Sequence, residues 1–216
     1  MNQLPLKASQ ISNLTDARYF AARGIDWLAF DLDPGSDAYL SLAEIHAICE
    51  WVEGPKIVGS FGLLDADEIL KIKNELNLDA IQLHPFMPLY QLEVLEKENT
   101  IQTFIVEDLN DLDQQLIAFI KERSPYVNYF SLDFSTNHFS WEKIQNHPAL
   151  VTTLKTFCEE HSIFFQLSFD DNNPLSFIEN IKPYALDIIA GSVEEKVGFK
   201  SFDDLDELLD HLEILD

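Results

Sequence analysis

Side chains that could transfer protons or bind a ligand follow several short apolar segments of this sequence. They carry hydroxyl, carboxylate, amide and imidazole groups: Ser9, Asp33, Gln82, His84, Asp133, Asp170 and Asp171. Carboxyl groups in different surroundings can act as a general acid and a general base, and clustered carboxylates can hold a cation or an amine. A serine hydroxyl is scarcely ionised near neutral pH, so Ser9 accepts a proton only if another group activates it. His84 is the candidate for that role.

Each of these residues also has a purely structural interpretation. Buried polar groups need hydrogen-bond partners whether or not a ligand is present. Gln82 and His84 could form hydrogen bonds with the rim of the protein fold. Asp133 could accept a hydrogen bond from a neighbouring backbone amide. Ser9 could simply replace another small side chain. The residue types alone leave both interpretations open.

The elements that would position these residues alternate regularly along the chain. The expected strands are 5–9, 26–31, 56–61, 79–83, 100–105, 127–132, 163–168 and 185–190. The segments between them are amphipathic, as in 65–76, where Ile69, Ile72 and Leu76 share one helical face. Polar residues that can begin a helix precede three of them: Asn13 or Thr15, Ser41 with Glu44, and Asp65 with Glu68.

Eight strand-then-helix units without a linker predict one domain over residues 1–216, an α/β protein with a closed parallel sheet. That architecture is the (β/α)8 or TIM barrel. An open doubly wound sheet that binds a dinucleotide would carry a GxGxxG motif, which is absent from the sequence. In a barrel the C-terminal ends of all strands surround one mouth, so the polar residues above should converge there.

The charge of the chain restricts its partners. Lys plus Arg number 14 against 38 Asp plus Glu, which gives a net charge of -24. Such a chain is not expected to bind nucleic acid or an anionic membrane. Cys49 and Cys158 are expected to be reduced thiols. The N-terminus does not resemble a signal peptide and no long apolar run is present, so a cytoplasmic protein is expected.

Several segments resemble phosphoribosylanthranilate isomerase, a barrel enzyme of tryptophan biosynthesis. "KASQISNLTDA" resembles the family's K-I-C-G-I-T-N-x-x-D-A opening, with Lys7, Asn13 and Asp16 in place. "RGIDWLAFDLDPGSDAYLS", "IVGSFGLLDADEILKIKNELNLDAIQLH", "SLDFSTNHFSW" and "DIIAGSVEEKVGFKSFDDL" resemble later units of the same family in the same order. The resemblance implies a single barrel without a cofactor or a metal, and a small-molecule ligand in its mouth.

The resemblance also implies roles for individual residues. The family carries out an Amadori rearrangement with an aspartate as general acid, which falls on Asp133, and a cysteine as general base, which falls on Ser9. The family's arginine for the anthranilate carboxylate falls near Ala38. Of the glycine-rich turns that bind its phosphate, the last keeps only Gly191 with Ser192 beside it, and the preceding turn contains Asp170 and Asp171.

Three functions therefore stay open. The chain could be a divergent isomerase, a barrel that has lost catalysis and binds a ligand or partner, or an acidic site for a cation or an amine. The expected ligand-binding residues are Gln82, His84, Asp33, Asp170, Asp171, Gly191 and Ser192, and the expected catalytic residues are Asp133 and Ser9. Altered or lost isomerase activity is the favoured expectation.

Overall fold

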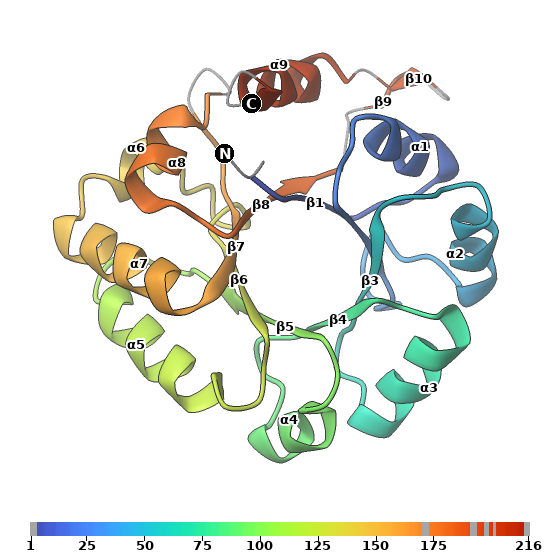
Figure 1. Ribbon diagram of the computed structural model, residues 1–216, viewed down its shortest axis with the longest axis horizontal. Helices are drawn as coiled ribbons and strands as arrows, with labels where there is room; N and C mark the ends of the chain where they lie inside the picture. The colour runs from blue at the N-terminus through green and yellow to red at the C-terminus, as the bar shows by residue number, and fades with distance from the viewer. Residues whose placement is uncertain (1–3, 170–172, 191–193, 197–198, 201, 214–216) are drawn as a thin grey trace.

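The computed structural model describes residues 4–169, 173–190, 194–196, 199–200 and 202–213. Eight parallel strands close into a barrel, each paired with the next and β8 with β1 (Figure 1). The strands are β1 (Leu6–Ser9), β2 (Trp27–Asp31), β3 (Lys56–Ser60), β4 (Ala80–Leu83), β5 (Thr100–Ile105), β6 (Tyr129–Asp133), β7 (Ser162–Gln166) and β8 (Ala185–Ile189). The prediction of a closed parallel (β/α)8 barrel is confirmed.

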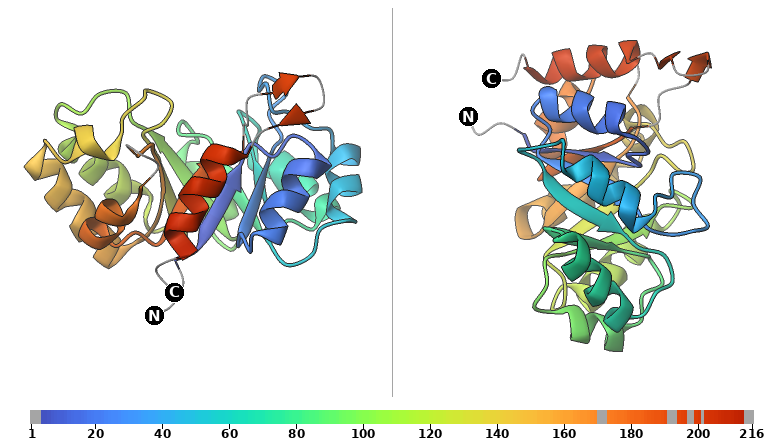
Figure 2. Two further views of the ribbon diagram at one scale, coloured as in Figure 1. Left: turned by 90° about the horizontal axis from the view of Figure 1, so that it is seen from above. Right: turned by 90° about the vertical axis from the view of Figure 1, so that its right-hand side faces the viewer.

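Helices surround the barrel as an outer layer, as the end-on view in Figure 1 shows. They are α1 (Leu14–Ala22), α2 (Leu42–Cys49), α3 (Ala66–Leu76), α4 (Leu89–Leu95), α5 (Leu112–Arg123), α6 (Trp141–Ile144), α7 (Pro148–Glu160), α8 (Leu175–Ile181) and α9 (Asp203–Glu213). Outside the barrel, β9 (Glu194–Lys196) and β10 (Phe199–Lys200) form a short antiparallel pair, which both views of Figure 2 also show apart from the barrel strands.

The helix starts follow from local side chains. Asn13 accepts a hydrogen bond from the Asp16 amide, and Ser41 and Glu44 form a complete capping box. Asp65 accepts from the Glu68 amide at the start of α3. These bonds satisfy amide groups that have no partner within the first turn. Of the two caps expected for the first helix, Asn13 is therefore the one used.

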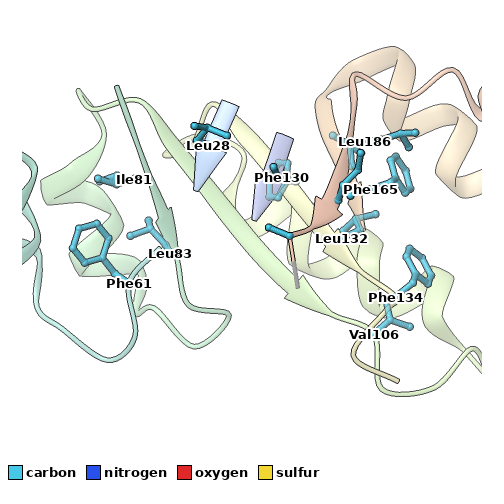
Figure 3. Close-up of a cluster of buried hydrophobic side chains, with 14 of the residues drawn as sticks. Leu28, Phe61, Ile81, Leu83, Val106, Phe130, Leu132, Phe134, Phe165 and Leu186 are labelled. Atoms are coloured by element: carbon cyan, nitrogen blue, oxygen red, sulfur yellow. The ribbon is translucent and has the colours of Figure 1, made fainter. Parts of the chain in front are cut away.

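The strands separate two apolar regions. Side chains that face the helices form the larger core, in which Leu132, Phe165 and Leu186 lie side by side on β6, β7 and β8 (Figure 3). A second cluster fills the barrel interior around Trp27 and Phe164. Polar residues of the barrel interior therefore gather above this cluster, toward the C-terminal ends of the strands.

The seventh strand is shorter than expected, because its pairing in the barrel stops at Gln166. Ser168 instead pairs with Ser140 in an isolated bridge, which turns the chain toward the loop before α6. Cys49 and Cys158 are both free thiols, as expected, and burial raises the pKa of Cys158 to about 12. None of the described helices is long and apolar enough to cross a membrane.

Candidate functional site at the mouth of the barrel

A polar cavity of about 340 Å³ opens at the C-terminal ends of the strands. Its lining includes five of the residues that the sequence predicted for the site: Ser9, Asp33, Gln82, His84 and Asp133. Further polar side chains that line it are Gln10, Asp31, Ser36, Ser60, Thr103, Ser135, Thr136, His138 and Gln166. The prediction that Ser9 and Asp133 face the same mouth is confirmed.

Ser9 is the last residue of β1 and belongs to a buried network at the floor of the cavity. Its hydroxyl donates to Asp187 Oδ1 at 2.6 Å, while Lys7 Nζ donates to Asp187 Oδ2, also at 2.6 Å. Lys7 and Asp187 are directly paired in the register of β1 with β8, and both are buried. Burial raises the pKa of Asp187 above its ordinary value, and Lys7 and Ser9 offset part of that rise.

Asp187 is a site residue that the sequence reasoning missed. It lies inside the strand predicted at 185–190, where an acidic residue among apolar neighbours was the available signal. A buried carboxylate requires a charged or hydrogen-bonding partner. Lys7, which the reasoning noted only as part of a motif, is that partner.

Asp133 ends β6 and accepts hydrogen bonds from several directions. Its Oδ1 atom accepts from the amides of Ser135 and Thr136, the Ser135 hydroxyl and Gln166 Nε2, at 2.9 to 3.2 Å. Its Oδ2 atom accepts from the Thr136 hydroxyl. In all of these bonds the Asp133 side chain is the acceptor. Asp133 thus accepts from neighbouring backbone amides, as its structural interpretation expected. A general-acid role for Asp133 stays a prediction.

His84 does not activate Ser9 by a direct hydrogen bond in this structure. Its Nδ1 atom accepts from the Phe86 amide at 3.3 Å, and within the described part of the chain no bond joins it to Ser9. The hydroxyl of Ser9 is directed to Asp187 instead. Gln82 donates from Nε2 to the Thr103 hydroxyl at 3.1 Å on the next strand, so part of its side chain supports the cavity wall.

Asp31 and Asp33 bring two more carboxylates to the cavity from the end of β2. The Asp33 Oδ1 atom accepts from the Gly35 amide at 2.9 Å. Gly62, in the loop after β3, packs so closely on Asp33 that a Cβ atom there would overlap the carboxylate. A glycine at position 62 thus lets the two loops meet.

The charges around the cavity are one-sided. Asp31, Asp33 and Asp133 line it, whereas no lysine or arginine does so among the residues that the structure describes. In the same part of the chain, no group of three or more His, Cys, Asp or Glu side chains is arranged to hold a metal ion. The predicted ligand-binding residues Asp170, Asp171, Gly191 and Ser192 lie outside the described residues.

The fold and the position of the cavity define the class of protein. This chain is a (β/α)8 barrel with a polar pocket at the C-terminal mouth, which is where proteins of this architecture carry their active sites. The class by itself does not define a reaction, because the same barrel supports many chemistries.

Comparisons with known proteins narrow the class. Over 153 residues the chain is 28% identical to N-(5'-phosphoribosyl)anthranilate isomerase of Methanocaldococcus jannaschii, covering 67% of each chain. The phosphoribosylanthranilate isomerase structure from Thermotoga maritima matches with a TM-score of 0.76 and 22% identity over 97% of this chain and 98% of that one. The enzyme from Thermus thermophilus gives a TM-score of 0.72 and 24% identity over 98% and 100%.

No family model matches the sequence. The relative and the solved structures nevertheless confirm the resemblance to phosphoribosylanthranilate isomerase that the sequence predicted. The chain is similar in sequence to a phosphoribosylanthranilate isomerase, and its barrel has the same fold as the solved isomerases.

Proposed function

We propose that this barrel binds a small polar ligand, neutral or cationic, and has lost or changed the isomerisation that gives its relatives their name. The observation that carries the proposal is the charge of the cavity. Three aspartates line it and no described lysine or arginine balances them. At a surface-like dielectric each carboxylate would oppose a phosphate dianion by about 1 kcal/mol or more. A protonated amine or an uncharged polyol meets no such repulsion.

The position of Ser9 supports the loss of the original proton transfer. A cysteine is expected there by resemblance, and a thiol ionises far more readily than a hydroxyl. The Ser9 hydroxyl keeps its own proton in a hydrogen bond to Asp187, so it can take a proton from a substrate only if Asp187 accepts the first one. The net charge of -24 on the whole chain further supports a cytoplasmic protein that binds this small ligand rather than nucleic acid or a membrane.

The bond between Ser9 and Asp187 favours a second candidate, a changed isomerase acting on an uncharged or cationic sugar. In that reaction Ser9 Oγ would take a proton from a substrate carbon while its own proton passes to Asp187 Oδ1 at 2.6 Å. Asp133, at the end of β6, would start protonated, give its proton to the substrate ring oxygen and recover one from the hydroxyl that becomes the ketone, while Asp187 would return its proton through Ser9 to the neighbouring carbon. Loss of turnover in Asp187→Asn with ligand binding retained would distinguish this candidate from a binding protein.

Thermal shift compares the two ligand classes directly. We expect ethanolamine or glucosamine to raise the melting temperature, and phosphate or ribose 5-phosphate to have no comparable effect at the same low millimolar concentration. A ligand at ten times its Kd stabilises the folded state by about 1.4 kcal/mol, or roughly 3 to 6 °C for a chain of this size.

Two matched variants assign the effect to the cavity. Asp31→Asn removes one charge from the lining and should reduce the amine shift, whereas Asp37→Asn makes the same change at an exposed position of the loop that follows β2. Stabilisation by phosphate that equals or exceeds that by the amines would contradict the proposal.

A further inference from the structure

An apolar surface lies beside the mouth, over the loops that follow β3 and β4 and the outer side of α4. Large hydrophobic side chains protrude there: Leu63 is 80% exposed, Phe86 74%, Tyr90 65% and Val94 52%. Seven such side chains are exposed in the described part of the chain, so more than half of them occur in this one region. Figure 1 shows α3 and α4 as neighbours in the outer layer. We call Leu63, Phe86, Tyr90 and Val94 the α4 patch.

The α4 patch has a hollow as well as protruding side chains. A depression of about 270 Å³ lies between the two loops, and its apolar lining includes Leu63, Leu64, Phe86, Met87 and Tyr90. Val94 follows Tyr90 by one helical turn and thus extends the same face of α4. A hollow beside a row of protruding apolar groups suits a partner that inserts one large anchor side chain and covers the groups around it.

Exposed carboxylates flank the α4 patch on both helices. They belong to Asp65, Asp67 and Glu68 at the start of α3, and to Glu93 and Glu96 at the end of α4. The exposed lysines along the same two segments are Lys71 and Lys97, and no described lysine or arginine lines the hollow. The net charge of -24 adds to this field at longer range. Charge therefore favours a basic partner and opposes a second acidic chain or an anionic membrane.

The closed barrel restricts the form of that partner. Each of the eight barrel strands pairs with a neighbour on both sides, so none of them has a free edge to which an extended peptide could add. A helix satisfies its own backbone hydrogen bonds and presents apolar side chains at i, i+3, i+4 and i+7. It can lay that apolar face on the α4 patch while basic side chains beside the face reach the carboxylates of α3 and α4.

We infer that the α4 patch docks an amphipathic helix of a partner protein, one with an apolar stripe flanked by lysine or arginine. Contacts with Leu63 and Phe86 supply most of the affinity, because an ion pair at an exposed rim contributes little. The carboxylates speed association and select a basic sequence. Gly62 and His84 line both the hollow and the cavity at the mouth, so the docked helix lies beside the ligand site.

Binding of a synthetic helix to the full chain tests this inference. The probe is a labelled peptide of about 18 residues, or five helical turns, with leucines on one face and lysines beside them. Fluorescence anisotropy should give a Kd of about 1 to 100 µM at about 0.05 M salt. Raising the salt to about 0.3 M should increase the Kd at least about fivefold, because it screens the attraction. A scrambled peptide of the same composition, and a peptide with glutamate in place of lysine, should each bind at least about tenfold more weakly.

Matched variants locate the docking surface. Phe86→Ser and Leu63→Ser remove apolar groups from the α4 patch and should each raise the Kd of the basic peptide at least about tenfold. Trp51→Ser makes the same kind of change at a residue that is 70% exposed and lies after α2, and it should leave the Kd within about threefold. Glu93→Gln should raise the Kd about two- to fivefold, whereas Glu159→Gln removes the same charge from an exposed position of α7 and should leave it unchanged. Because all of these side chains are exposed, the melting temperatures should remain close to that of the wild type.

Three results would overturn the inference. One is no binding of the basic peptide up to about 1 mM at low salt. Another is binding that Phe86→Ser and Leu63→Ser weaken no more than Trp51→Ser does. The third is a different occupant, seen as a rise of mass with concentration in light scattering, or as binding to phosphatidylcholine vesicles, that Phe86→Ser and Leu63→Ser abolish.

Discussion

Purified wild type protein should convert phosphoribosylanthranilate at least about 10²- to 10⁴-fold more slowly than an intact isomerase, because a positioned general base contributes that much to the rate. By the resemblance, Ser9 falls at the position of that base, and its hydroxyl holds its own proton in the bond to Asp187. The acidic cavity adds to the loss by weakening the binding of a phosphorylated substrate. Product formation from synthetic substrate measures the rate.

Ser9→Cys alone should not restore the reaction. The thiol would reintroduce a group that ionises near neutral pH, but Asp31 and Asp33 would still face the substrate. In a chain that keeps Ser9, Asp31→Asn together with Asp33→Asn should improve binding of the anionic substrate more than it improves turnover. Comparing the rates and the substrate affinities of these variants distinguishes the effect of the missing base from the effect of the altered binding site.

Growth of a tryptophan auxotroph provides the control. The Methanocaldococcus jannaschii isomerase, expressed in the same strain, should support growth without tryptophan, and the present chain should not. Complementation by the unmodified chain would show that its site still performs the reaction.

Replacing Lys7 by Met should lower the free energy of unfolding by about 3 to 5 kcal/mol. The substitution leaves the Asp187 carboxylate buried without its counter-ion, and breaking a buried pair at one side costs about that much. Urea unfolding at neutral pH measures the change. A loss below about 1 kcal/mol would show that the pair is better solvated than the structure indicates.

A double variant separates the interaction between Lys7 and Asp187 from the separate effects of changing each residue. Lys7→Met combined with Asp187→Asn removes both charges, while the asparagine oxygen can still accept from the Ser9 hydroxyl. It should be clearly more stable than either single variant, which gives a favourable coupling energy in the cycle. Lys73→Met is the matched control, because the Lys73 pair with Glu98 is partly exposed and should contribute no more than about 1 kcal/mol.

Much of the fold could be predicted because its signals are local. Strands at 27–31, 56–60 and 185–189 lie within the predicted segments, since a buried strand needs only a short apolar run. Asn13, Ser41 and Asp65 cap helices through bonds to amides three residues away. The order of these units was enough to indicate a barrel and to place Ser9 and Asp133 at one mouth.

The partners of the site residues were decided only by the closed barrel. Ser9 and Asp187 are 178 residues apart, and they meet because β8 pairs with β1 to complete the ring. Asp133 likewise bonds Gln166 across the pairing of β6 with β7. The local sequence gives the types of the polar residues and their positions along the strands. The strand register decides which donor meets which acceptor. Closure fixes that register, because a shift of one residue would turn Lys7, Ser9 and Asp187 out of the interior.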